Sequence, residues 1–195
     1  MIRGTISENL QAFERRASLR SLTPAAVAIV LVLSDRIPSV PIFQRPLTMT
    51  RHAGQMALPG GKLHPGETVV DCAIREVYEE LGLAVDAADV LGMLDDFDTQ
   101  SGFTITPVVI WSGGEVDGLR PSEAEVAKLY VIGTPELRET VGAAALGAAS
   151  EFSLKFRRVE VFAPTAAILY QFSEVALDGR TCRVADFYQP PWTHR

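Results

Sequence analysis

The sequence predicts a layered α/β domain, and three observations lead to this fold class. Stretches with helical periodicity occur before, between and after stretches rich in Val, Ile and Leu. No repeat or low-complexity linker separates these stretches, so they are expected to pack as one set of layers. The 195 residues, 47% hydrophobic and 22% charged, can bury a core without disulfides or a structural metal. We therefore expect residues 1–195 to form a single domain.

The first expected elements are a helix and a buried strand. Thr5 and Glu8 have the spacing of a capping box, and apolar residues follow at helical intervals, which predicts a helix over residues 6–19. Residues 25–33 follow a proline and are dense in Val, Ile and Leu, as in a strand buried on both faces. Two short strands and a glycine turn are then expected at residues 41–45, 55–58 and 59–61.

The clearest helix in the sequence spans residues 67–81. Its apolar residues recur at spacings of one, three and four, which forms one stripe, and Gly82 supplies a C-terminal stop. Residues 143–150 are expected to be a frayed helix end and loop. Residues 178–195 could pack on the sheet or cover the site, and we favour packing. The other expected elements are strands at residues 90–97, 104–111, 126–132 and 156–162 and helices at residues 135–146 and 164–177.

Charge and composition exclude several classes of protein. Acidic residues outnumber basic ones 24 to 18, which is the opposite of the basic footprint of proteins that bind long nucleic acids. The longest apolar run, residues 24–33, is about half of a membrane span, and the N-terminus lacks the apolar core of a secretion signal. We therefore expect a cytoplasmic protein without a membrane partner. Cys72 and Cys182 lack the spacing of a metal site and are expected to be buried or idle thiols.

Three glutamates carry the first chemical signal. Glu76, Glu79 and Glu80 stand at positions i, i+3 and i+4 of the helix over residues 67–81, so their carboxylates emerge on one side. Like charges at this spacing destabilise a helix by about 0.2–0.5 kcal/mol per pair. A hard cation such as Mg²⁺ or Mn²⁺ takes oxygen ligands and offsets the repulsion, and the Gly61 carbonyl is a natural further ligand. A solvated acidic face is the alternative.

The spacing around these glutamates resembles the box of the Nudix hydrolases, G-x5-E-x7-R-E-U-x-E-E-x-G-U, in which U is a bulky aliphatic residue. Gly61, Glu67, Arg75 and Gly82 fall on its other fixed positions, and the match spans residues 61–83. A chance match in a chain of this length has a probability on the order of 10⁻⁷. The resemblance implies a Nudix α/β/α sandwich with a mixed central sheet. It also implies hydrolysis of a phosphoanhydride in a small, nucleotide-type substrate, with Mg²⁺ or Mn²⁺ as cofactor.

The resemblance further implies roles for the residues of the box. Glu76, Glu79 and Glu80 would bind the divalent cations, with Glu79 and Glu80 as the core ligands. Glu67 and Arg75 would pair and hold the loop against the helix. Homodimers are frequent in the family, and a homodimer stays open here because no pattern in the sequence identifies an interface.

The general base is open between a box glutamate and a carboxylate from a later loop. Of the later carboxylates we choose Glu125, because residues 121–126 resemble the loop and strand start that follow the nucleotide cleft in relatives. An exposed acidic loop is the alternative interpretation. The other candidates outside the box are Asp95, Asp96, Asp98 and Glu123.

The segment upstream of the box resembles the signature of the coenzyme A diphosphatase branch, L-L-T-x-R-[SA]-x3-R-x3-G-x3-F-P-G-G. Arg45, Gly54 and residues 59–61 fall on their positions without gaps. The match is partial, because other residues stand at positions 41–43, 46, 50 and 58. Arg51 lies one place from the missing second arginine, and we expect it to reach the same phosphate.

Coenzyme A carries a 3′-phosphate besides its diphosphate, so a site for it needs several positive donors. The donors near the box are Arg45, Arg51, His52 and Lys62, and loop charges that only solubilise the surface are the alternative. The leading hypothesis is hydrolysis of coenzyme A or acyl-coenzyme A to 4′-phosphopantetheine and adenosine 3′,5′-bisphosphate. The alternatives are ADP-ribose, a nucleotide sugar or a nucleoside triphosphate as substrate, and a ligand-binding Nudix module that does not hydrolyse.

Overall fold

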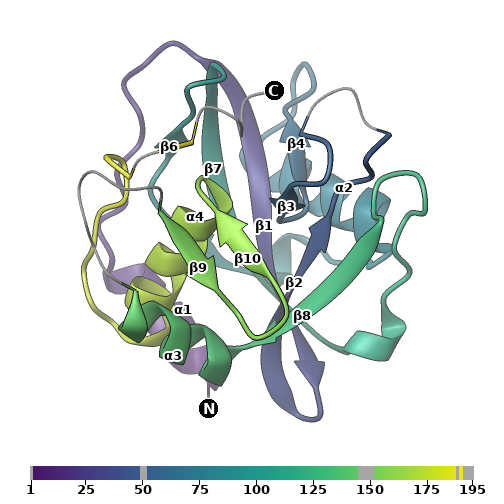
Figure 1. Ribbon diagram of the computed structural model, residues 1–195. Helices are drawn as coiled ribbons and strands as arrows, with labels where there is room; N and C mark the ends of the chain where they lie inside the picture. Colours follow the sequence, from purple (N-terminus) through teal and green to yellow (C-terminus); the bar gives the residue numbers. More distant parts are fainter. Residues whose placement is uncertain (1, 49–51, 145–151, 188, 191–195) are drawn as a thin grey trace.

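A mixed β-sheet with helices on both faces forms the centre of the molecule (Figure 1), in agreement with the predicted α/β class. The computed structural model describes residues 2–48, 52–144, 152–187 and 189–190. The long strands β1 (Thr23–Ser34) and β7 (Phe103–Glu115) run parallel at the centre, and the other strand pairs are antiparallel. The remaining strands of this sheet are β2 (Ile37–Gln44), β3 (Met56–Ala57), β4 (Gly60–Lys62), β5 (Val90–Met93), β6 (Phe97–Asp98) and β8 (Lys128–Gly133).

The sheet divides between β1 and β2. These strands pair only near their hairpin, at residues 32–34 of β1. At its other end β1 pairs through residues 25–27 with β4, while the end of β2 pairs with β3. The short strands β3 and β4 therefore fill the gap that the two long strands leave. Residues 58–59 join β3 to β4, so this short segment is fixed between a strand paired with β2 and a strand paired with β1.

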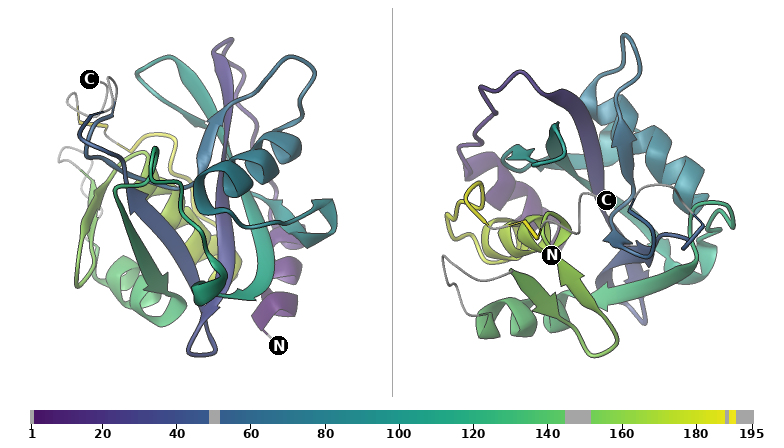
Figure 2. Two further views of the ribbon diagram at one scale, coloured as in Figure 1. Left: turned by 90° about the vertical axis from the view of Figure 1, so that its right-hand side faces the viewer. Right: turned by 45° about the horizontal axis from the view of Figure 1, so that its top comes forward.

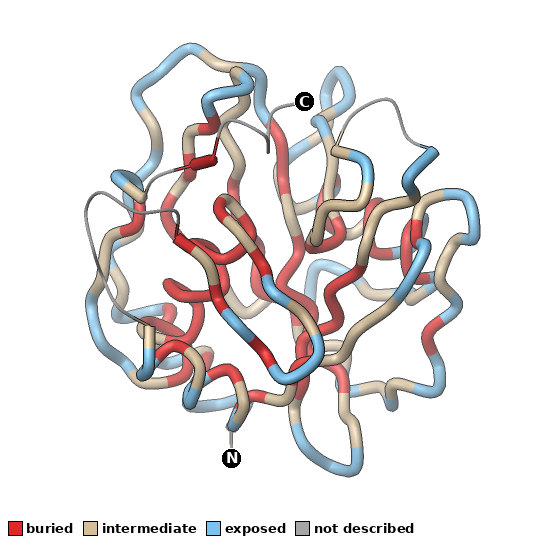
Figure 3. Tube along the Cα trace, viewed as in Figure 1, coloured by how far each residue is buried: buried red, intermediate tan, exposed pale blue. Residues whose placement is uncertain are grey.

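Helices bury both faces of β1. Figure 2 shows α2 (Val69–Leu81) on one side of the sheet and the other helices on the opposite side. Ala26, Ala28 and Val30 belong to the core cluster under α2, whereas Ile29 and Leu31 belong to the cluster of the opposite face. This alternation confirms the prediction of a strand buried on both faces, and Figure 3 shows the middle of β1 buried and its ends less so. The other helices are α1 (Ile2–Ala12), α3 (Thr134–Ala143) and α4 (Thr165–Gln171), which a π-helical segment (Phe172–Leu177) extends.

Several predicted elements are confirmed with shifted ends. The helix predicted over residues 67–81 begins at Val69 and ends at Gly82, which has the left-handed conformation expected of a helix stop. The helix predicted over residues 164–177 is present as α4 and its π-helical extension. The helix predicted to reach residue 146 ends at Ala143, and the loop predicted at residues 143–150 lies largely outside the described residues. Two single 3₁₀ turns complete the helical elements, Ala87–Asp89 and Val116–Gly118.

The N-terminal helix is shorter than predicted. Thr5 lies inside α1, so it does not cap the helix, and α1 ends at Ala12 instead of residue 19. The chain beyond it is held by carboxylates of the segment between β5 and β6. The backbone N–H of Arg16 donates to Asp95 (2.7 Å), and that of Ser18 donates to Asp96 (2.9 Å). These tertiary hydrogen bonds replace the helical ones that the local pattern favours.

Three further expectations about strands are wrong. The strand predicted over residues 90–97 is split into β5 and β6, because the segment between them turns its carboxylates toward the N-terminal chain. The strand predicted over residues 156–162 is a hairpin of β9 (Ser153–Lys155) and β10 (Glu160–Phe162). Phe156 is buried although it lies in the turn between the two strands. The alternation of apolar residues therefore continues through the turn, and the sequence pattern does not mark where the strand ends. The predicted turn at residues 59–61 contains β4 instead.

The glycines of β4 serve close packing and not a turn. A Cβ at Gly60 would lie 2.5 Å from the Ala26 carbonyl oxygen and 2.9 Å from the Val27 Cα, both backbone atoms. A Cβ at Gly61 would overlap the Glu76 carboxylate. A side chain at position 60 would therefore clash with the backbone of β1, and one at position 61 would displace the Glu76 carboxylate.

No helix of the described residues combines the length and the apolar character needed to cross a bilayer.

Gly60→Ala is expected to destabilise the protein by about 1–3 kcal/mol, the usual range for atoms added to a packed interior. The measurement is the free energy of unfolding in urea. Gly142→Ala in α3 is the control, since nothing lies within 4 Å of its new Cβ; its stability should stay the same or rise by up to about 1 kcal/mol. An unchanged stability of Gly60→Ala would contradict the packing argument.

Candidate active site

Helix α2 positions a cluster of carboxylates against β4. A capping box between Thr68 and Asp71 begins the helix, and its buried apolar side chains anchor it on the sheet. One turn apart on the same side, Glu76 and Glu80 retain only 8% and 1% of their accessible surface. The side chain of Glu79 is 47% exposed. We call these three residues the glutamate cluster.

The two buried glutamates contact the glycine strand. The Gly60 N–H donates to Glu80 Oε2 (2.9 Å), and Glu76 lies directly against Gly61. Burial raises the pKa of Glu80 to about 8, although Arg45, with Nη2 3.4 Å from Oε1, opposes this effect. Burial also raises the pKa of Glu76 above its ordinary value. Burial therefore disfavours the charged form of both carboxylates, although each has an arginine nearby.

Arg75 joins the helix to the loop before it. Its Nε and Nη2 lie 2.8 and 3.1 Å from the two carboxylate oxygens of Glu67, which is the bidentate geometry of an arginine–carboxylate pair. Its Nη1 also contacts Glu76 (2.7 Å) and Glu79 (2.9 Å). The hydrogen bonds from Arg75 lower the pKa of Glu67 to about 2. One guanidinium thus faces three carboxylates, so it orients the cluster without neutralising it.

The donor set of the cluster fits a divalent cation. Its donors are carboxylate oxygens, with a backbone carbonyl at Gly61 beside them, and hard cations such as Mg²⁺ and Mn²⁺ prefer oxygen. Within the described part of the chain, no three His, Cys, Asp or Glu side chains are arranged as a complete metal site, and Arg75 contacts both Glu76 and Glu79. The raised pKa of buried Glu80 is the observation that favours an added positive charge.

Glu125 belongs to a loop that is tied to the end of α2. The Ser122 N–H donates to the Glu80 carbonyl (3.0 Å), and the Arg120 N–H donates to the Leu81 carbonyl (2.7 Å). The charge of Glu125 contributes to the raised pKa of both Glu76 and Glu80, so the structure brings it to the same side of the helix. Glu123 in the same loop is exposed.

The other three candidate carboxylates are occupied in a separate network. Asp95 accepts two hydrogen bonds from Arg183, each 2.9 Å long. Asp96 pairs with Arg15, and Asp98 accepts from Ser18 and Thr104. None of the three is among the residues that line the pocket described next. Their hydrogen bonds join the N-terminal segment to the sheet and the C-terminal segment.

A pocket of about 650 Å³ adjoins the glycine strand, and three of the four predicted phosphate donors line it: Arg45, His52 and Lys62. The fourth, Arg51, lies outside the described residues. Arg45 reaches from this pocket to Glu80, and Lys62 Nζ lies 5.1 Å from the centre of the Phe103 ring. His52 Nδ1 lies 3.2 Å from Gln55 Oε1. The pocket and the glutamate cluster therefore share Gly60, Gly61 and Arg45.

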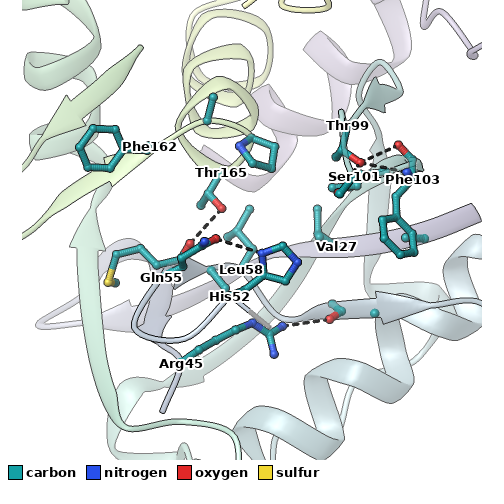
Figure 4. A pocket seen from close by; sticks show the side chains of 18 of the residues that line it. Val27, Arg45, His52, Gln55, Leu58, Thr99, Ser101, Phe103, Phe162 and Thr165 are labelled. Atoms are coloured by element: carbon teal, nitrogen blue, oxygen red, sulfur yellow. Dashed lines mark hydrogen bonds between the residues drawn. The ribbon is translucent and has the colours of Figure 1, made fainter. Parts of the chain in front are cut away.

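The opposite side of the pocket is formed by residues that the sequence analysis missed. Figure 4 shows Phe162 and Thr165 facing the loop of His52, with Phe103 across the pocket. Gln189 also lines it, so part of the C-terminal segment borders the pocket, while Phe187 packs on the rings of Phe152 and Tyr170. No local pattern marks these residues, because only the folded chain brings them to β3 and β4.

The family model and the similar proteins point to the same family. Residues 22–151 match the family model described as the NUDIX domain. The chain is 31% identical over 140 residues to an uncharacterized Nudix hydrolase, NudL, of Yersinia enterocolitica, which covers 66% of this chain and 68% of that protein. It is 32% identical over 120 residues to Nudix hydrolase 3 of Caenorhabditis elegans, which covers 60% of this chain but only half of the length of that relative.

A solved structure supports the fold. The crystal structure of a NUDIX hydrolase from Nitrosomonas europaea superposes with a TM-score of 0.54 at 15% identity, over 88% of this chain and 79% of the other. At this identity the likeness concerns the fold alone.

Glu67→Gln is expected to destabilise the protein at neutral pH and to do so less in acid. The pKa of Glu67 is lower in the folded state (about 2) than its ordinary value of 4.5, so its ion pair with Arg75 stabilises fully above pH 4.5. This contribution is lost as the pH falls through about 2. The difference in unfolding free energy between wild type and variant, measured in urea from pH 7 to 2.5, should shrink below pH 4.5.

Glu139→Gln, at an exposed position of α3, is the control and should show little difference at any pH. A Glu67→Gln difference that is constant over the whole range would contradict the role of the charged pair.

Proposed function

Because the chain belongs to the Nudix family, as the match over two thirds of its length shows, we propose that it hydrolyses a phosphoanhydride bond with Mg²⁺ or Mn²⁺. One observation carries the proposal. The glutamate cluster, with two buried carboxylates of raised pKa, meets the glycine strand beside a pocket that holds Arg45 and Lys62. A solvated acidic face would not bury Glu76 and Glu80.

Each group of residues has a definite task in this reaction. Glu76, Glu79 and Glu80 would hold the cation, with the Gly61 carbonyl as a further ligand. The bound cation would neutralise the charge of the diphosphate and make a water molecule more acidic. Arg45 and Lys62 bind phosphate oxygens from the pocket side. Glu67 and Arg75 hold the cluster in place, and Glu125 accepts the proton of the attacking water.

Coenzyme A or acyl-coenzyme A is the substrate that we propose. The partial signature over residues 41–61 supports this choice, as does the place of Arg45 between the pocket and Glu80. His52 and Lys62 lie on the same pocket and can meet further phosphate oxygens. ADP-ribose, nucleotide sugars and nucleoside triphosphates remain the alternatives within the same chemistry.

A substrate panel tests the proposed function. Phosphate-bond hydrolysis is measured with Mg²⁺ for coenzyme A, ADP-ribose, a nucleotide sugar and a nucleoside triphosphate. We expect kcat/KM to be highest for coenzyme A. A preference of about tenfold for ADP-ribose, equivalent to about 1.4 kcal/mol, would reject the substrate and leave the chemistry intact. No hydrolysis of any compound would instead favour a binding module.

Two isosteric variants separate the cation ligands from the general base. Glu80→Gln removes a buried charge at the cation site, so kcat should fall on the order of 100-fold or more and the Mg²⁺ concentration for half-maximal rate should rise. Glu125→Gln should lower kcat on the order of 100-fold at an unchanged Mg²⁺ requirement. Glu139→Gln on α3 is the control. Undiminished kcat in either site variant would remove that residue from its proposed role.

A further inference from the structure

One wall of the pocket comes from outside the matched part of the chain. The family match ends at residue 151, whereas residues 160–165, from β10 and the start of α4, line the pocket. We call residues 160–165 the C-terminal wall. Gly60 and Gly61, which belong to the matched segment, line the same pocket as this wall. The pocket is therefore bounded both by the matched segment and by a segment outside it.

Hydrogen bonds hold this wall in place. Phe162 is paired with Ser153 in the β9–β10 hairpin, and Thr165 Oγ1 donates to the Met56 carbonyl of β3 (3.2 Å). Beside the wall, buried Gln189 donates to the Asp98 carbonyl (2.9 Å). The shape of the pocket is therefore established before a ligand binds, which reduces the ordering cost of binding.

Charge is unevenly distributed around the pocket. Arg45 and Lys62 lie at the β4 side, next to the glutamate cluster. In the C-terminal wall the one charged residue among the described lining is Glu160, whose carboxylate accepts a hydrogen bond from Ser153 Oγ (2.7 Å). Lys155, whose Nζ lies 3.6 Å from Glu160 Oε1, is not among the lining residues, so within the described lining this wall offers no lysine or arginine to a second anionic group. The apolar part of the lining includes Val27, Met56, Phe103 and Ile105, and the C-terminal wall adds Phe162 and Pro164.

Two aromatic rings bound this apolar part. Phe103 and Phe162 lie on opposite sides of the pocket (Figure 4), and both are partly buried. A volume of about 650 Å³ is within the range that holds a ligand of drug size. The pocket thus combines a side that carries Arg45 and Lys62 with a side whose lining suits an uncharged, apolar group.

We propose that the C-terminal wall determines specificity: it selects diphosphate substrates whose second substituent is an uncharged, largely apolar chain, and Phe162 is its main contact. This inference rests on the proposed function for the cleaved bond. It adds the part of the substrate that the C-terminal wall would contact. An acyl-pantetheine arm has this chemistry. A second nucleotide or a sugar phosphate does not.

The test compares ADP-ribose, coenzyme A and octanoyl-coenzyme A. The last two share 3′-phospho-ADP and the pantetheine arm and differ only in the acyl chain, whereas ADP-ribose lacks both the 3′-phosphate and the arm. Phe162→Ala should raise KM for octanoyl-coenzyme A about tenfold, equivalent to about 1.4 kcal/mol of lost contact. Its KM for ADP-ribose should change less than about twofold, and kcat should be unchanged, because Phe162 does not touch the reacting atoms. Phe162→Leu keeps an apolar side chain and should stay close to wild type.

The same three ligands are titrated by calorimetry in EDTA, which measures binding without hydrolysis. Calorimetry distinguishes the proposed specificity from the proposed hydrolysis, because ligand affinity can be measured even if no compound is hydrolysed. Leu19→Ala, at a fully exposed apolar position, is the control for a general loss of stability. An equal loss for all three ligands in Phe162→Ala, no loss at all, or tighter binding of ADP-ribose than of octanoyl-coenzyme A by wild type would overturn the inference.

Discussion

The site depends on a strand without side chains at Gly60 and Gly61. This strand pairs with β1 on one side and lies against the Glu76 carboxylate on the other, at distances that no Cβ allows. Because the backbone comes this close, its Gly60 N–H reaches the buried carboxylate of Glu80 and its edge becomes part of the pocket. A single packing constraint thus joins the sheet, the helix and the cavity.

The second constraint is electrostatic. The carboxylates of the glutamate cluster are held near one another by burial and by Arg75, whose one charge is shared among Glu67, Glu76 and Glu79. Among the described residues, Arg45 is the cation that forms an ion pair with Glu80, and burial still raises the pKa of Glu80. Such an arrangement carries a free-energy cost in the folded protein. A bound divalent cation, as we propose, would offset that cost.

The two parts of the pocket differ in origin. The end beside α2 comes from the matched segment of the chain and carries Arg45 and Lys62, which we propose as the phosphate donors. The C-terminal wall comes from a hairpin and a helix start that pack on the far face of the sheet. If the two segments bind different parts of a substrate, as we propose, the C-terminal wall can vary without a change in the glutamate cluster.

The amino-acid sequence by itself determined the helix from Thr68 to Gly82, the spacing of its glutamates and the double burial of β1, because these features depend on residues close together in the chain. The tertiary structure alone decided the early end of α1, the strand at Gly60 and the C-terminal wall. Arg16 meets Asp95 across 79 positions, and Thr165 meets Met56 across 109. No local periodicity encodes such contacts, since they form only when the sheet has brought distant segments side by side.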